Sequence, residues 1–229
     1  ILHYKVAETR REREAAFRLV YDVYTVSGLI SSNPSRMRVT PYHLLPSTAV
    51  FLALHQDKPL YTVSLVGDGE FGLPLEERYT ADVSALRARG LRTAEVSCLA
   101  GRDTMPSGLE GFTVYVMLIG MVLQYARFHG LHGVLLAVHP RHARFYERFF
   151  GCEIFGELKS YEAVNGHPAI GCYHDFAALD RKGYRLCEEI YRIKHTPGAL
   201  LARPITAEDR EYFADAANFA KTGLLPMAA

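Results

Sequence analysis

The spacing of apolar and polar residues predicts regular structure from the start of the chain. Residues 2–7 alternate with a period of two, as an edge strand does. A helix is expected to follow from Thr9, because a threonine N-cap with Glu12 three residues later has the spacing of a capping box. Residues 15–23 supply the apolar face of this helix, and Gly28 marks its end.

Further apolar segments continue this pattern along the chain. Short apolar or alternating runs predict strands at residues 48–54, 60–66, 92–99, 133–138, 152–164 and 169–176. Longer segments predict helices at residues 76–90, 111–128, 140–149 and 176–192, with a last short helix at 207–220. The helix at 111–128 is almost entirely apolar, which indicates burial on most of its sides.

The order of these elements predicts the fold class. A hairpin leads into a β-α-β-α-β unit, which favours an α/β fold with a central mixed sheet flanked by helices on both faces. The length suits a single domain over residues 1–229, with residues 177–229 as a C-terminal helical extension. Residues 31–47 contain three prolines and are expected to form a long ordered loop that folds over the functional site.

Composition narrows the class of protein. The net charge is +1, which gives no overall attraction to nucleic acid or to a membrane surface. The four cysteines are widely spaced and are expected to be free thiols in a reducing compartment. No signal peptide is recognised, and no apolar run reaches the roughly 18 residues needed to cross a bilayer. We therefore expect a soluble cytoplasmic protein without a nucleic-acid partner and without stable membrane insertion.

The segment AVHPRHARFYERFFGCEIFGE, residues 137–157, carries a first family resemblance. A buried strand, a basic aromatic helix and Gly151 follow one another as in the fifth strand and the next helix of the GNAT acyltransferase fold. His139 stands where that family often has an asparagine, and Tyr146 matches its tyrosine seven residues later. The Q/R-x-x-G-x-G/A loop, with which the family cradles the pyrophosphate of coenzyme A, is missing from the corresponding stretch, LAGRDTMPSGLEGF.

Other segments resemble more specialised acyltransferases. AAFRLVYDVY and AEVSCLA resemble the autoinducer (acyl-homoserine lactone) synthases, although Cys98 replaces their arginine after the strand serine. NPSRMRVTPYHLLPSTAVFLAL, SLVGDGEFGLPLEERY and AEVSCLAG resemble the long-chain N-acyl amino acid synthases of the N-acyltyrosine synthase type, over roughly residues 4–175. That second resemblance implies transfer of a long-chain fatty acyl group from acyl carrier protein to the α-amine of an amino acid. Tyrosine as the amino acid is implied by the resemblance alone.

Amide formation from a thioester requires a base, donors for the oxyanion and an acid for the leaving thiolate. Glu95 lies in an otherwise apolar strand and is the candidate base for an amine whose pKa is about 8 or higher. Strand alternation puts Ser97 on the same face as Glu95. The resemblance implies that the fourth and fifth strands separate, which frees N–H groups of Ser97, Cys98 or Leu99 for the oxyanion. Tyr146 or a nearby histidine is the candidate proton donor.

Two of these residues also have a structural explanation. Glu95 could instead face outward and pair with Arg92 or Arg102. Tyr146 could belong to a core-facing aromatic face in FYERFF. The sequence leaves both alternatives open.

Substrate binding requires partners for a phosphate, a carboxylate and an acyl chain. Arg102 is the candidate for the phosphate of phosphopantetheine, and Arg18 or Arg38 for the amino-acid carboxylate. An apolar tunnel is expected to be lined by Met117, Leu118, Met121, Val122, Leu135 and Ala137. Leu99 and His139 complete the predicted substrate-binding set. Core packing is the alternative for the tunnel residues, and an ordinary surface loop is the alternative around Arg102.

The predicted partner is an acyl carrier protein, which is acidic and therefore calls for a basic docking surface. The candidate docking residues are Arg141, Arg144, Arg148 and Lys159, with a solvated charged face as the alternative. We expect no tightly bound cofactor, because the carrier delivers phosphopantetheine together with the acyl group. The histidines at 129, 132, 139 and 142 form HxxH twice but lack a carboxylate or cysteine at ligand spacing, so no metal site is predicted.

Three other functions remain as alternatives. A conventional acetyl-coenzyme A N-acetyltransferase is disfavoured by the missing pyrophosphate loop. An autoinducer synthase is disfavoured by Cys98 and by the lack of an acidic pattern in residues 31–47. A non-enzymatic acyl-binding module would bind acyl groups without turning them over.

Overall fold

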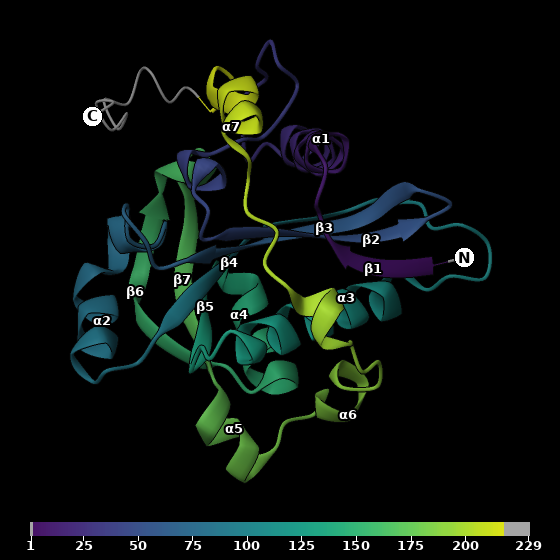
Figure 1. Cartoon of the computed structure of the whole chain (residues 1–229). Helices are drawn as coiled ribbons and strands as arrows, with labels where there is room; N and C mark the ends of the chain where they lie inside the picture. The colour runs from purple at the N-terminus through teal and green to yellow at the C-terminus, as the bar shows by residue number, and fades with distance from the viewer. Residues whose placement is uncertain (1, 218–229) are drawn as a thin grey trace.

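The computed structural model describes residues 2–217 and contains one seven-stranded sheet (Figure 1). The strands are β1 (Leu2–Val6), β2 (Thr48–His55), β3 (Lys58–Gly67), β4 (Thr93–Gly101), β5 (Gly133–Val138), β6 (Glu153–Tyr161) and β7 (His167–Asp175). Their spatial order is β1-β2-β3-β4-β5-β7-β6. Only β4 and β5 pair in parallel among these neighbours, so the predicted mixed sheet is confirmed.

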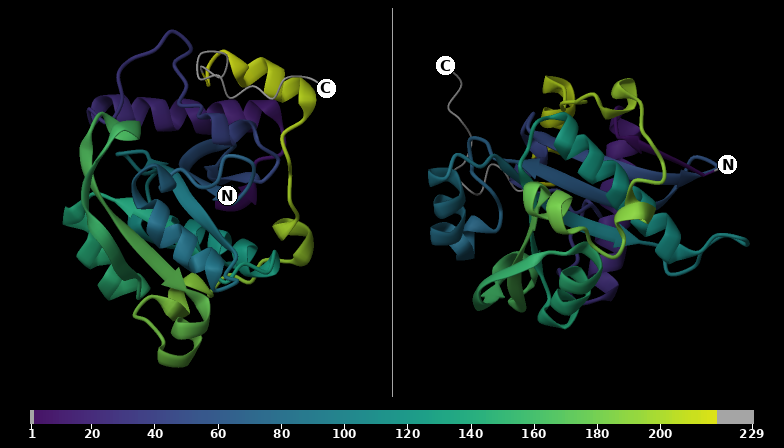
Figure 2. Two further views of the ribbon diagram at one scale, coloured as in Figure 1. Left: turned by 90° about the vertical axis from the view of Figure 1, so that its left-hand side faces the viewer. Right: turned by 90° about the horizontal axis from the view of Figure 1, so that it is seen from below.

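Helices cover both faces of this sheet (Figures 1 and 2). They are α1 (Arg10–Val26), α2 (Glu76–Ala88), α3 (Gly111–Phe128), α4 (Pro140–Phe150), α5 (Phe176–Lys182), α6 (Cys187–Ile190) and α7 (Ala207–Ala214). Strand alternation separates two cores, because Phe51 packs with residues of α3 whereas Leu52 packs with residues of α1. In Figure 1, α1 and α7 therefore lie on one side of the sheet, and α3 and α4 lie on the other.

The start of α1 shows how the local sequence fixes an element. The backbone N–H of Glu12 donates to Thr9 Oγ1 at 3.3 Å, and the N–H of Thr9 donates to Glu12 Oε2 at 3.0 Å. Both bonds satisfy N–H groups that the first helical turn leaves without partners. The predicted capping box is confirmed.

The C-terminal part of the chain differs from the predicted elements. The helix expected at 176–192 is interrupted, because Gly183 adopts a φ of +67° that ends α5 before α6 begins. The strand expected at 152–164 ends at Tyr161, and a short 3-10 turn (Glu162–Val164) follows it. The helix expected at 207–220 ends at Ala214, and the last residues of that prediction lie outside the described part of the chain.

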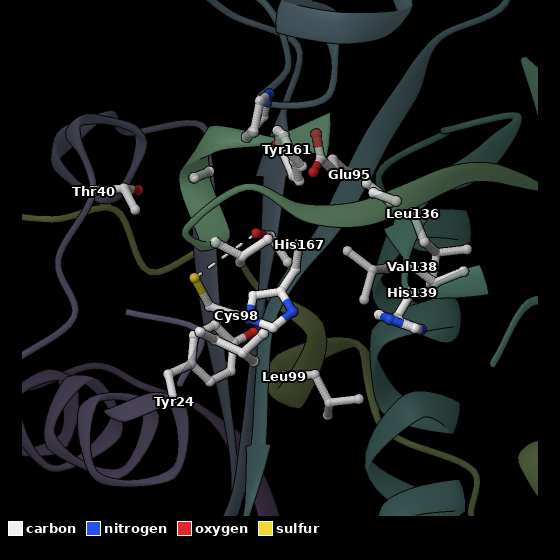
Figure 3. A pocket seen from close by; sticks show the side chains of 18 of the residues that line it. Tyr24, Thr40, Glu95, Cys98, Leu99, Leu136, Val138, His139, Tyr161 and His167 are labelled. Carbon is white, nitrogen blue, oxygen red and sulfur yellow. Dashed lines mark hydrogen bonds between the residues drawn. The ribbon is translucent and has the colours of Figure 1, made fainter. Parts of the chain in front are cut away.

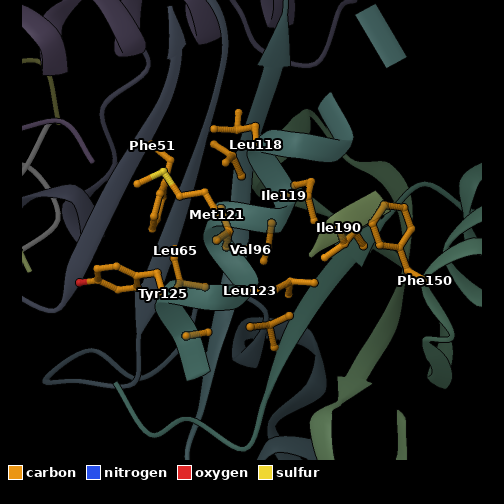
Figure 4. Close-up of a cluster of buried hydrophobic side chains, with 14 of the residues drawn as sticks. Phe51, Leu65, Val96, Leu118, Ile119, Met121, Leu123, Tyr125, Phe150 and Ile190 are labelled. Carbon is orange, nitrogen blue, oxygen red and sulfur yellow. The ribbon is translucent and has the colours of Figure 1, made fainter. Parts of the chain in front are cut away.

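Helix α3 forms the centre of the larger core (Figure 4). Leu118 and Met121 are fully buried there, as the apolar pattern predicts. By length and composition α3 could also cross a membrane, which corrects the expectation that no apolar run is long enough. However, 67% of it is buried inside the protein, and buried core helices pass the same test.

The sheet opens between its two parallel strands. Strand β4 pairs with β5 only through residues 93–95, and the strands separate beyond Glu95. On its other edge, β4 pairs regularly with β3 at Ser97 and again at Ala100, with an irregularity between them. Cys98 lies in this irregularity with a φ of +51°, a left-handed value that is uncommon for a residue with a side chain. The separation of the strands makes room for a site inside the sheet.

Candidate active site

A cavity of about 670 Å³ lies where β4 and β5 separate (Figure 3). Its walls come from the end of α1, the loop at residues 38–42, the start of α2, both separated strands, the start of α4 and the β6–β7 hairpin. The loop at 31–47 therefore reaches the cavity as expected from its length and prolines. Segments that are distant in sequence meet here because all of them pass the same opening in the sheet.

Glu95 is the buried carboxylate of this cavity. Its side chain is 2% exposed, and its Oε2 accepts the backbone N–H of Leu75 at 2.7 Å. Burial raises the pKa of Glu95 to about 8, although the bond from Leu75 opposes the shift. The alternative pairing with arginine is wrong, because Arg92 donates to the carbonyl of Gly130 and Arg102 donates to that of Pro59.

The irregular part of β4 contributes the neighbouring wall. Ser97, Cys98 and Leu99 all line the cavity, and Ser97 Oγ lies 3.7 Å from Cys98 Sγ. Cys98 and Leu99 fall outside the regular pairing with β3 and beyond the pairing with β5. Burial raises the pKa of the Cys98 thiol, which disfavours the thiolate that a nucleophilic cysteine needs. The geometry thus places a bulged backbone, rather than a reactive thiol, beside Glu95.

Tyr146 of α4 lines the cavity and also belongs to an aromatic cluster. Its hydroxyl lies 3.4 Å from that of Tyr115, and its ring packs against Phe145 and Phe150. Burial raises the pKa of Tyr146, so its hydroxyl keeps its proton at neutral pH. Core packing and a place in the cavity wall are therefore compatible for this residue.

The structure separates the two arginines proposed for the amino-acid carboxylate. Arg38 lines the cavity, where one of its terminal nitrogens donates to the carbonyl of Ala163 at 2.8 Å. Its Nε is buried without a partner among the described residues. Arg18 does not line the cavity; it is exposed on α1 and pairs with Glu14 at 2.6 Å. The placement of Arg18 therefore contradicts its predicted role, since its helical position points it away from the sheet opening.

Residues 15–175 match the model of the family described as N-acyl amino acid synthase FeeM. The protein belongs to this N-acyl amino acid synthase family. The solved structure of FeeM, an N-acyl amino acid synthase from uncultured soil microbes, is 26% identical with a TM-score of 0.70. That alignment covers 82% of this chain and 97% of FeeM.

Two autoinducer synthases are also similar in structure. LasI, an AHL synthase, is 10% identical with a TM-score of 0.61, covering 86% of this chain and 98% of LasI. BjaI, a CoA-dependent acyl-homoserine lactone synthase, is 16% identical with a TM-score of 0.57, covering 96% of this chain and 99% of BjaI. These two likenesses show the fold alone, and the comparison with curated proteins gave no match. As a member of this family, the protein is a GNAT-like N-acyltransferase that transfers an acyl group to an amino acid.

The remaining predicted substrate-binding residues of this N-acyl amino acid synthase divide into two groups. Leu99 and His139 line the cavity, and His139 also caps α4 by accepting the N–H of Arg141. Met117 and Met121 are buried in the core around α3 and do not line the cavity. Arg102 is exposed and bonded to Pro59, away from the cavity. These three placements contradict the predicted roles, because sequence spacing along α3 and its preceding loop does not show where the sheet opens.

The predicted docking residues of the synthase also divide. Arg141 lines the cavity, and Arg144 and Arg148 are exposed on the same helix α4. Lys159 does not join them: its Nζ donates to the carbonyl of Arg78 at 2.6 Å and lies 5.1 Å from the ring centre of Tyr79. A partly buried lysine with these contacts is unsuited to docking, which corrects that prediction.

Several residues of the cavity were missed by the sequence analysis. Tyr24, Glu77, Tyr161 and His167 all line it. His167 was placed before the predicted last strand, whereas β7 begins at His167 itself. No periodic pattern marks these positions, since each belongs to the end of a different element. Within residues 2–217, no group of three or more histidine, cysteine or acidic residues could hold a metal ion.

Proposed function

We propose that this enzyme joins a long-chain fatty acyl group, delivered by acyl carrier protein, to the α-amine of an amino acid, with tyrosine as the leading candidate. The observation that carries this proposal is the buried carboxylate of Glu95 in a cavity between separated parallel strands. A carboxylate whose pKa is raised to about 8 is matched to an α-amine of similar pKa, so proton transfer between them is nearly balanced.

The cavity provides a partner for each polar end of the amino acid. Arg38 is a suitable partner for the carboxylate, because its Nε is buried without a hydrogen-bond partner among residues 2–217. Glu95 takes a proton from the α-ammonium group, and the neutral amine then attacks the thioester carbonyl. Backbone N–H groups at Cys98 and Leu99 stabilise the oxyanion. Tyr146 donates a proton to the leaving pantetheine thiolate.

Two features of the chain support acyl carrier protein as the acyl donor. The segment before α3 lacks the glycine spacing that holds the pyrophosphate of coenzyme A. Phosphopantetheine on a carrier has a single phosphate and no adenosine, so it does not need that loop. Arg144 and Arg148 are exposed on α4 and form no ion pair among the described residues, which leaves them available to an acidic carrier.

The proposal of tyrosine as the amino-acid substrate rests on the family resemblance and on the residues that line the cavity. Tyr42 and Tyr161 line the cavity, and Figure 3 shows Tyr161 beside Glu95. Aromatic rings such as these favour an aromatic side chain through stacked or edge-on contacts. The reaction is expected in the cytoplasm, where carrier-bound acyl groups are made.

The test is a mass-spectrometric product assay on the purified protein. It is offered palmitoyl and myristoyl groups on acyl carrier protein and, separately, acetyl and palmitoyl coenzyme A, each with all twenty amino acids. A long-chain N-acyl amino acid made mainly from the carrier supports the proposal and names the amino acid. An acetylated product from coenzyme A alone would replace it with a conventional acetyltransferase. A long-chain product made from coenzyme A alone would support long-chain acyl transfer but contradict acyl carrier protein as the donor.

A further inference from the structure

We propose that His167 is a second catalytic base of this synthase, which takes the proton from the attacking nitrogen as the amide bond forms. The inference rests on the proposed function and deepens it by adding a residue that acts on the amine. It is carried by the register of the sheet, the face on which the histidine lies and the lack of partners for its ring in the described part of the chain.

The register places His167 over the opening in the sheet. Val138, the last residue of β5, pairs with Ile170 of β7. Residues 167–169 therefore continue past the end of β5, where they pair only with β6. Since β4 and β5 separate at this same end, the start of β7 borders the gap between them. Figure 3 shows the imidazole of His167 between Cys98 on one side and Val138 and His139 on the other, with Leu99 below it.

His167 lies on the same face of the sheet as Glu95. Glu95 pairs with Leu135, and Leu135 pairs with Tyr173, so all three side chains point to one face. Alternation along β7 carries that face from Tyr173 through residues 171 and 169 to His167. Tyr146 comes from α4, which covers the opposite face. The two candidate bases, Glu95 and His167, thus lie on one face of the sheet. The candidate acid, Tyr146, comes from the helix on the other face.

The hairpin that carries His167 is fixed at its tip. Asn165 donates to the carbonyl of Gly28 at 3.1 Å, and Arg38 donates to that of Ala163 at 2.8 Å. Figure 2 shows this tip against the end of α1. A base must be held at a defined distance from the proton it takes. These two bonds hold the hairpin beside the cavity without using the imidazole.

The ring of His167 is free of protein partners within the described residues, whereas other histidines at the cavity are used structurally. His139 accepts the N–H of Arg141, and His142 accepts a bond from the Arg141 side chain. Imidazole is the commonest general acid or base in enzymes, and its free nitrogen here faces the cavity rather than a structural contact.

The attacking nitrogen must lose two protons before the amide is complete. An α-ammonium nitrogen carries three protons, and the amide nitrogen keeps one. Glu95 takes the first proton and makes the amine nucleophilic. As the C–N bond forms, His167 takes the second from nitrogen. The C–S bond then breaks, its electron pair leaves with sulfur, and the thiolate is protonated by Tyr146. Glu95 and His167 release their protons to solvent, and solvent restores Tyr146.

Chemical rescue tests this assignment. The His167→Ala variant is assayed with and without added imidazole and 4-methylimidazole, using the acyl donor and amino acid that the wild type accepts. We expect kcat to fall roughly 10²- to 10⁴-fold, as for loss of a general base. Added imidazole should restore part of the rate, and the more basic 4-methylimidazole should restore more. His3→Ala, at an exposed position on the edge strand β1, controls for effects of imidazole itself.

The outcomes separate this inference from the proposed function. Unchanged kcat in a folded His167→Ala protein would overturn the role of His167 alone. So would a raised KM for the amino acid with unchanged kcat, or lost turnover that imidazole restores in neither His167→Ala nor His167→Gly. If these variants fail to fold, His167→Asn is measured instead, and wild-type kcat in that variant overturns the inference. If the wild-type protein turned over no thioester, both the role of His167 and the proposed function would be refuted.

Discussion

At the scale of single residues, burial of Glu95 both raises its pKa and makes the stability of the fold depend on pH. The fold buries this carboxylate almost completely and offers it one backbone N–H, so its neutral form is favoured. The pKa of Glu95 is raised to about 8 from the usual glutamate value of about 4.5. Its protonated form therefore stabilises the fold at acidic pH, and this contribution declines as pH rises from about 4.5 through about 8.

The variant Glu95→Gln separates these two effects. We expect kcat to fall by at least roughly 10²-fold, because glutamine cannot accept the amine proton. The free energy of unfolding should exceed that of the wild type at pH 9, by an amount on the order of a few kcal/mol. Urea denaturation at pH 5, 7 and 9 measures the effect, with exposed Glu157→Gln as control. A constant stability difference between wild type and Glu95→Gln across this range would contradict a raised pKa.

Arg38 and Arg18 form a matched pair for a second test. Arg38→Gln should raise the KM for the amino acid roughly 10- to 100-fold, the equivalent of losing one charged hydrogen-bonded contact. Arg18→Gln should leave it unchanged, because Arg18 pairs with Glu14 outside the cavity. Steady-state kinetics with the acyl donor held at saturation measures both. Equal effects of the two substitutions, or an effect of Arg38→Gln on the acyl donor alone, would refute the carboxylate assignment.

At the scale of elements, strand β4 provides catalytic groups to the cavity, and helix α4 provides the proposed docking surface for the acyl carrier. The end of β4 leaves the regular ladder after Glu95 and presents irregular backbone to the cavity. Helix α4 begins at the same opening, capped by His139, and carries Arg144 and Arg148 on its exposed side. A carrier bound to α4 would therefore place its phosphopantetheine at the gap between the strands.

Charge reversal on α4 tests this arrangement. The double variant Arg144→Glu/Arg148→Glu should lower kcat/KM for the carrier-bound acyl group by roughly tenfold or more, with the difference shrinking at high salt. Turnover of a small pantetheine thioester should stay unchanged, since the cavity is intact. Lys58→Glu/Arg210→Glu, at exposed positions on other elements, is the matched control. A similar loss with both donors, or in the control, would argue against docking at α4.

At the scale of the whole molecule, the C-terminal segment ties both faces of the sheet together. Helix α6 packs on α3, where the carbonyl of Ile190 lies against Gly120. Farther along, α7 sits on α1: Asp209 bonds Arg10 at 2.7 Å, and Phe213 packs edge-on against Phe17. Because α1 and α3 lie on opposite faces, the segment braces the layers that enclose the cavity.

Gly120→Ala tests the contact between α6 and α3. A Cβ at position 120 would collide with the backbone oxygen of Ile190, so α6 has to move. We expect a loss of about 1–3 kcal/mol in the free energy of unfolding. Gly198→Ala, where a Cβ meets nothing within 4 Å, should change it by less than about 0.5 kcal/mol. Denaturant titration measures the free energy of unfolding of both variants. Equal values for Gly120→Ala and Gly198→Ala would mean that α6 does not pack on α3.

The sequence by itself determined most of the elements and their order. Periodicity located the strands and the buried helix α3, and the spacing of Thr9 and Glu12 located the start of α1. These signals are local, since helix and strand periods and caps depend on residues a few positions apart. The segment after residue 176 was predicted less well, because Gly183 ends a helix there in a left-handed conformation that the apolar pattern does not mark.

Only the tertiary structure decided which side chains meet. The unusual glutamate in an apolar strand pointed to Glu95, but the choice of Arg38 over Arg18 depended on which of them faces the opening between β4 and β5. Of the residues predicted to line a tunnel, Ala137 lines the cavity, whereas Met117 and Met121 are buried in the core around α3 and do not. His167 reached the site through the offset of β7 past the end of β5. Such an offset is set by pairing between distant segments, which no local pattern records.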